Sequence, residues 1–163
     1  MKKLILICLI YVVFSSRSVS DRGVKLIKQF EGCRLTAYYD SVGVITIGYG
    51  TTNADKSITG TTIKKGMKIS QQTAEKWLKA SLNKKYGPKV NKYDNHYHWT
   101  QNEFDALISF AYNIGSIDQL TDHGKRSKST IASKIPEYCH AGGKKLAGLV
   151  RRRKAERDLF LRK

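Results

Sequence analysis

Acidic residues, cysteines and long apolar runs are all scarce in this chain. Only 13 Asp and Glu residues stand against 30 Lys and Arg, so the formal charge over 163 residues is +17. An excess of this size favours polyanionic partners by long-range attraction, and it would suit nucleic acid, anionic lipid or a cell wall. A solubilising surface without a specific partner is the simpler explanation and stays open.

Three cysteines are too few for a disulfide framework. Cys8 lies in an apolar N-terminal run, so only Cys33 and Cys139 would remain to pair if that run were removed. Sequence does not reveal the distance between them, and we expect two free thiols. The four histidines form no metal-ligand cluster and no nucleotide-binding motif occurs, so we predict neither metal nor cofactor.

The apolar run from Leu4 to Phe14 has eleven residues. As a helix it would span about 16 Å, against the roughly 30 Å of a bilayer core, which disfavours a stable transmembrane anchor. Its basic start and its small-residue tail, 15–20, are typical of a secretory signal peptide. We therefore expect residues 1–20 to be a signal peptide, cut before Asp21, on a secreted or periplasmic protein. A retained signal-anchor with transient membrane tethering is the alternative.

Export would change the interpretation of the charge. Nucleic acid becomes a poor partner outside the cytoplasm, whereas bacterial envelopes carry carboxylates and phosphates that a basic protein approaches rapidly. We expect anionic envelope surfaces as partners, no nucleic acid, and a monomer. The length fits one domain with a core large enough for two lobes around a cleft.

A carboxylate stands near the end of the first predicted helix. Asp21 is a suitable N-cap, apolar residues follow at helical spacing, and Gly32 ends the helix with Glu31 in its last turn. The negative end of the helix dipole opposes ionisation of Glu31, which suits a general acid near neutral pH. An isolated glutamate in this place would more simply be a surface residue.

A β-hairpin is predicted next. Residues 35–39 and 44–49 are rich in β-branched and aromatic side chains, and the turn residues 40–43 separate them. Alternation along the second strand directs Thr46 to one face, where it can meet a cleft, and the isoleucines to the other. Asp40 alone is a common turn residue and Thr46 alone an ordinary strand residue. Their joint spacing with Glu31 is what suggests a catalytic site.

Glu31, Asp40 and Thr46, followed by Gly48-Tyr49-Gly50, resemble the signature of phage-type lysozymes, glycoside hydrolase family 24. Residues 109–115 and 141–152 also match, so the resemblance covers most of the chain after residue 21. It implies an α+β, mostly helical lysozyme-like fold with a small N-terminal lobe bearing the hairpin sheet and a larger helical C-terminal lobe. The first helix would pack with the helical lobe.

The resemblance also implies an activity, hydrolysis of bacterial peptidoglycan at the β-1,4 bond between N-acetylmuramic acid and N-acetylglucosamine, with inversion. Glu31 would protonate the leaving oxygen, and ionised Asp40 with Thr46 would position water. The expected substrate-binding residues are Gly48, Tyr49, Gly50, Tyr112 and Asn113. Tyr112 has an equal alternative as a core aromatic. The family commonly has a histidine after Gly50, where this chain has Thr51.

The lobes, about 21–69 and 88–163, should be joined by a helix over about 70–87. Ser70 is its expected N-cap, Gly87-Pro88 its end or kink, and Trp77 a core residue rather than a sugar platform. Ile58 and Ile63 are candidates for short strands that complete the small sheet.

A capping box at Thr100 to Glu103 predicts a buried helix that runs to Ile114. Helical structure with a break at Pro136 is expected over 130–138, and a turn over 141–144.

The last predicted helix, 149–161, carries the densest charge run, Arg151 to Lys154. We expect a solvated cationic surface, with an Arg152 and Glu156 pair at i,i+4 spacing; a membrane-perturbing helix is the second interpretation. The corresponding rival function is a secreted cationic membrane-active or wall-binding antibacterial protein that acts without catalysis. A nucleic-acid-binding protein would require that the apolar run does not direct export.

Overall fold

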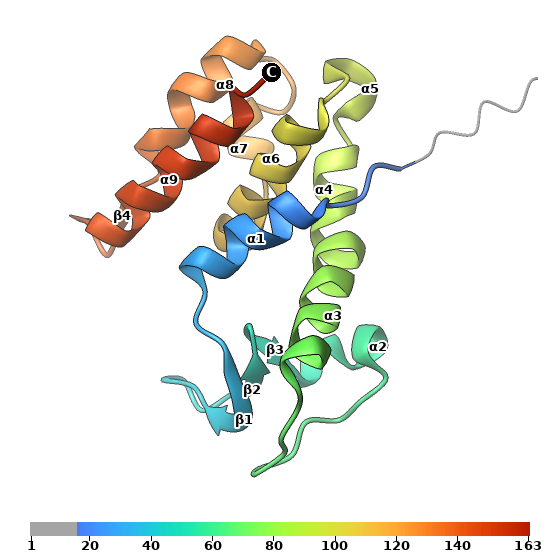
Figure 1. The fold of residues 1–163 in the computed structure, drawn as a ribbon. Helices are drawn as coiled ribbons and strands as arrows, with labels where there is room; N and C mark the ends of the chain where they lie inside the picture. Colours follow the sequence, from blue (N-terminus) through green and yellow to red (C-terminus); the bar gives the residue numbers. More distant parts are fainter. Residues whose placement is uncertain (1–15) are drawn as a thin grey trace, which may run out of the picture.

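The computed structural model describes residues 16–163, and the predicted signal segment lies almost entirely outside the described residues. A small sheet and a group of helices occupy opposite ends of the molecule, and one long helical rod connects them (Figure 1). This is the predicted α+β fold with a sheet lobe and a larger helical lobe.

The sheet lobe is built from three antiparallel strands in the order β1-β2-β3. Tyr38 of β1 pairs with Thr46 of β2, and Ile47 pairs with Thr51, which confirms the hairpin. The predicted strands at Ile58 and Ile63 are wrong. Ile58 lies in the short helix α2, and Ile63 is a buried loop residue. The bounds are β1 Arg34–Tyr39, β2 Ile45–Gly48, β3 Thr51–Thr52, a 3-10 turn Asn53–Asp55 and α2 Lys56–Thr59.

The connecting rod begins where Ser70 caps α3 (Gln71–Ser81). Gly87-Pro88 was expected to end or kink this helix, and the end is wrong because the rod continues past it. A π-helical turn (Leu82–Tyr86) leads into α4 (Gly87–Asn91), with Pro88 in the first turn of α4. Proline is tolerated there because the first N–H groups of a helix have no intrahelical acceptor. Trp77 packs with Ile47 and Ile63 in a separate small core, as predicted for a core residue.

The centre of the helical lobe is α6 (Gln101–Ile114), which begins at the predicted capping box of Thr100 and Glu103. It ends before Gly115, whose φ of 102° is readily adopted by glycine. Residues Phe104 to Ala111 are all buried. The first helix, α1 (Asp21–Phe30), packs on α6 and α9 (Ala147–Phe160), so it belongs to the helical lobe as expected.

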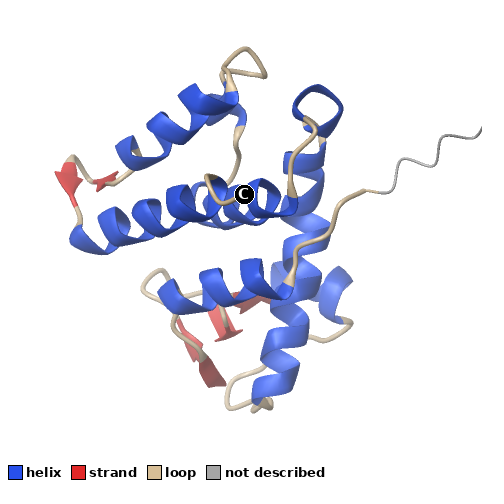
Figure 2. Ribbon diagram, turned by 45° about the horizontal axis from the view of Figure 1, so that its top comes forward, coloured by secondary structure: helices blue, strands red, loops and turns tan. Residues whose placement is uncertain are grey.

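The remaining elements complete the helical lobe (Figure 1). They include the predicted break at Pro136 and a second, two-stranded hairpin that lies far from the three-stranded sheet (Figure 2). Their bounds are α5 Asp94–Tyr97, α7 Asp118–Thr121, α8 Lys128–Lys134, a 3-10 turn Ile135–Glu137, β4 His140–Ala141 and β5 Lys144–Lys145. Within residues 16–163, no helix is long and apolar enough to cross a membrane.

Residues 17–20 form a strap on the helical lobe. Val19 is buried, and Ser20 caps α1 while its hydroxyl donates to Asp105 of α6. The side chain of Asn91 forms two hydrogen bonds with the backbone of Arg17. Its Oδ1 accepts from the Arg17 N–H, and its Nδ2 donates to the Arg17 carbonyl. A cut before Asp21 would remove these contacts, and that cut remains a prediction.

Candidate active site

Glu31 lies at the joint between the two lobes. It is the C-cap of α1, with extended backbone angles and its N–H donated to the Ile27 carbonyl at 3.1 Å, and β1 begins three residues later. It therefore stands one residue beyond the helix, still within the field of the helix end. Its side chain is 26% exposed and lines a cleft of about 430 Å³ together with Asn113 of α6 and Arg152 of α9.

Arg152 is the neighbour that the sequence interpretation missed. Its Nη1 donates to Oε1 of Glu31 at 2.6 Å, and its side chain is only 4% exposed. The expectation of a fully solvated run from Arg151 to Lys154 is wrong at its two central residues, because Arg152 and Arg153 are both buried. They can be buried because each pairs with the buried carboxylate of Glu156. The available signal was the family-like stretch 141–152, which ends on Arg152.

Asp40 occupies the turn between β1 and β2. Its Oδ1 accepts from the backbone N–H groups of Val42 at 3.0 Å and Val44 at 2.8 Å, an arrangement that holds the turn. Gly43, with φ of 82°, completes it. The sequence located this residue correctly in a hairpin turn, but Asp40 does not line the Glu31 cleft.

Thr46 sits in the middle of the sheet and is 5% exposed. Its hydroxyl donates to the carbonyl of Val44 at 3.0 Å on its own strand. Ile45 and Ile47 pack in the small core with Trp77, so Thr46 lies on the opposite face of β2. Thr46 is not among the residues that line the Glu31 cleft of about 430 Å³, and its expected orientation toward the substrate stays a prediction. A part in positioning water stays a prediction.

The residues after β2 connect the lobes. Tyr49 is buried, its carbonyl accepts from the Tyr112 hydroxyl, and its own hydroxyl accepts from Gln71 at 2.6 Å. Gly48 is buried as well; an added Cβ would lie 3.3 Å from that of Ala74, so the missing side chain serves packing on α3. Gly50 is exposed, with φ of 95°.

Tyr112 and Asn113 have different environments at the end of α6. Burial raises the pKa of Tyr112, and its hydroxyl is used within the protein, which favours the interpretation as a core aromatic. Asn113 is exposed in the cleft, where Arg153 donates to its Oδ1. Cys33 and Cys139 are both free thiols, as expected.

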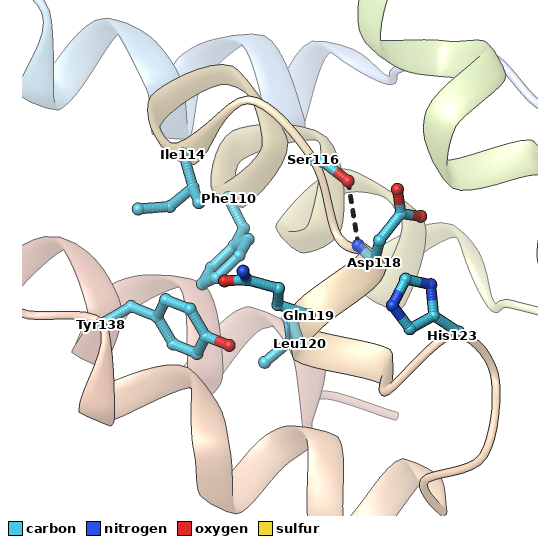
Figure 3. A pocket seen from close by; sticks show the side chains of 8 residues that line it. All are labelled: Phe110, Ile114, Ser116, Asp118, Gln119, Leu120, His123 and Tyr138. Atoms are coloured by element: carbon cyan, nitrogen blue, oxygen red, sulfur yellow. Dashed lines mark hydrogen bonds between the residues drawn. The ribbon is translucent and has the colours of Figure 1, made fainter.

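A second cavity, of about 420 Å³, shares no lining residue with the Glu31 cleft (Figure 3). Phe110, Tyr138 and Leu120 form its apolar side. Asp118 and His123 form the other side, where the Asp118 N–H donates to Ser116 Oγ at 2.9 Å. Within residues 16–163, no cluster of three or more His, Cys, Asp and Glu residues could hold a metal ion.

The family model described as phage lysozyme matches residues 28–156. An endolysin of Lactococcus phage c2 is 43% identical over 144 residues, which cover 87% of this chain and 59% of that protein. A SAR-endolysin of Haemophilus phage HP1 is 29% identical over 162 residues, covering 88% and 81%. The solved endolysin of Escherichia coli O157:H7 phage FAHEc1 superposes with a TM-score of 0.70 at 38% identity, covering 89% and 94%. The chain therefore belongs to the phage lysozyme family.

Proposed function

We propose that this chain is a muramidase, a glycosidase that cleaves the β-1,4 bond between N-acetylmuramic acid and N-acetylglucosamine in bacterial peptidoglycan. The observation that carries the proposal is a partly exposed carboxyl, Glu31, that lines a cleft at the joint between two lobes. The phage lysozyme family and the endolysin relatives support it. The chain spans about three fifths of the length of the Lactococcus phage relative. The proposed activity therefore rests on the site that this chain itself contains.

Glu31 would act as general acid and donate its proton to the leaving glycosidic oxygen. Because Arg152 binds the ionised form of Glu31, this contact must loosen when the acid is protonated. Asp40 would stay ionised, balance the oxocarbenium-like charge and, with Thr46, orient the attacking water. In the present conformation only Oδ1 of Asp40 accepts hydrogen bonds from described residues, which leaves Oδ2 for that water.

Export is part of the proposal. The basic start, the short apolar run and the small residues before Asp21 support secretion or release at the membrane, as does the similarity to a protein named SAR-endolysin. The expected partners are peptidoglycan and the anionic envelope around it. The burial of Arg152 and Arg153 removes two charges from the helix surface on which the non-catalytic rival depends.

The test is the release of reducing ends from purified peptidoglycan by wild-type protein and by Glu31→Gln. Loss of a general acid typically costs 10²- to 10⁴-fold, and we expect a loss in that range, with a similar direction for Asp40→Asn. Glu137→Gln is the control, because Glu137 is an exposed carboxylate paired with Lys134. A wild-type rate in Glu31→Gln would contradict the mechanism. Unchanged killing of intact cells by that variant, beside lost cleavage, would favour the rival for the biological effect.

A further inference from the structure

A buried carboxylate, that of Glu156, lies outside the cleft and binds two arginines. Each of these arginines contacts a residue that lines the cleft, Glu31 or Asn113. Glu156 of α9 is completely buried. Its Oε1 accepts from Nε of Arg152 at 3.0 Å and from the hydroxyl of Ser109 at 2.7 Å. Its Oε2 lies 2.9 Å from Nη1 of Arg153, an ion pair without hydrogen-bond geometry. Both carboxylate oxygens are thus directed at the two arginines.

The same two arginines each contact a residue that lines the cleft. Arg152 donates through Nη1 to Glu31, and Arg153 donates through Nη2 to Oδ1 of Asn113. Arg152 is also fixed by the Ser109 carbonyl, which accepts from its Nη2 at 3.1 Å. Glu156 therefore pairs with both guanidinium groups and helps to fix their orientation.

The four charged side chains of this cluster balance: Glu31 and Glu156 are acidic, and Arg152 and Arg153 are basic. Burying unbalanced charge is costly, so each arginine needs a carboxylate partner. Arg152 is shared between Glu31 and Glu156, and a general acid has to carry a proton before it reacts. An arginine bound to Glu31 alone would hold that carboxyl in its ionised form more strongly.

We propose that Glu156 is a positioning residue of the muramidase reaction: it orients Arg152 and Arg153 toward Glu31 and Asn113, and its negative charge limits how strongly Arg152 favours ionised Glu31. The inference rests on the proposed function for its catalytic consequence. Its electrostatic part concerns Glu31 in the free protein and is testable without substrate.

The charged and titratable groups around the pair act in known directions. Around Glu31 lie Arg152 and Arg151 of α9, and the Tyr112 phenol of α6 interacts with it electrostatically. Burial raises the pKa of Glu156, while Arg153, the Ser109 hydroxyl and Arg152 oppose that rise. Removing the negative charge of Glu156 should favour the ionised form of Glu31 in two ways. It takes away a like charge, and it leaves Arg152 with a single carboxylate partner.

The experiment compares wild type, Glu156→Gln and the control Asp158→Asn. Asp158 pairs with Lys154 at the surface of the same helix, also at i,i+4 spacing. We expect the alkaline limb of the kcat/KM profile to move to lower pH by about one unit in Glu156→Gln, and not in the control. The carboxyl carbon of Glu31, followed by NMR, should titrate at correspondingly lower pH. An unchanged limb and an unchanged titration in a folded Glu156→Gln variant would overturn the proposal.

Glu156→Gln leaves an unbalanced buried cation, so the variant is at risk of not folding. The double variant Glu156→Gln with Arg153→Gln removes one charge of each sign and serves in its place. Arg152 is then bound to Glu31 alone, and we expect a shift of the same direction and smaller size. A folded double variant that titrates like wild type overturns the proposal. If wild type does not cleave peptidoglycan, the proposed function fails, while the NMR titration still decides the electrostatic inference.

Discussion

The hydroxyl of Tyr112 on α6 donates a hydrogen bond to the backbone carbonyl of Tyr49, and so joins the helical lobe to the end of β2. The ring of Tyr112 also packs against Tyr86 of the connecting rod, with 5.2 Å between centroids. Gln71, at the start of α3, donates to the hydroxyl of Tyr49. The sheet, the rod and α6 therefore meet at these two tyrosines.

Replacing Tyr112 by Phe should lower the free energy of unfolding by about 1 kcal/mol, because the Tyr49 carbonyl loses its partner. The pH dependence should change as well. Burial raises the pKa of Tyr112, so its contribution to stability is complete below about pH 10 and is lost as the pH rises above that value. Urea unfolding at pH 7 and at pH 10–11 measures both effects. Wild type and the variant losing stability equally at high pH would contradict the prediction.

Removing the strap at residues 17–20 should destabilise the helical lobe. A chain that begins at Asp21 loses the buried side chain of Val19 and the N-cap of α1 at Ser20. Together these are worth roughly 2–4 kcal/mol. Thermal unfolding of chains that begin at residue 16 and at residue 21 tests this.

The same comparison bears on processing. A truncated chain as stable as the longer one would remove the structural objection to a cut before Asp21. If the strap is needed, sequencing the N-terminus of the exported protein should find a start at or before Arg17.

Asp118 should give the protein a stability contribution that disappears in acid. A hydrogen bond from Tyr93 and then one from Lys92 lower the pKa of Asp118 to about 2. Its contribution is therefore complete above about pH 4 and is lost as the pH falls through 2. The carboxylate is 37% exposed, so solvent screening limits the effect to about 1 kcal/mol.

Asp118→Asn should thus be less stable than wild type at pH 6, and the difference should shrink toward pH 2. Chemical unfolding across this range is the measurement, with Asp158→Asn as the matched surface variant. Parallel curves for Asp118→Asn and wild type would show that the pair contributes nothing to folding.

Features that depend on near neighbours in the chain were predicted well. Ser70 and Thr100 start helices because a capping hydroxyl needs only backbone N–H groups two or three residues away. The β1-β2 hairpin likewise follows from turn residues between two β-rich segments. Four-residue helices such as α5 and α7 were missed, since they are too short to show a period. The rod continues past Pro88 because Pro88 falls in the first turn of α4, after a π-helical turn that no local pattern indicated.

The sequence by itself placed Glu31 at the end of the first helix and Asp40 in a hairpin turn, because helix ends and turns are set by adjacent residues; the helix ends one residue before Glu31. The spacing also predicted the i,i+4 pair of Arg152 and Glu156, which the structure confirms. Only the tertiary structure decided that this pair is buried and that Arg152 binds Glu31, 121 positions away. A run of basic residues is normally solvated, and the burial of Arg152 and Arg153 depends on carboxylates and a carbonyl from three helices meeting at one place. That meeting is a property of how α1, α6 and α9 pack, which no local spacing encodes.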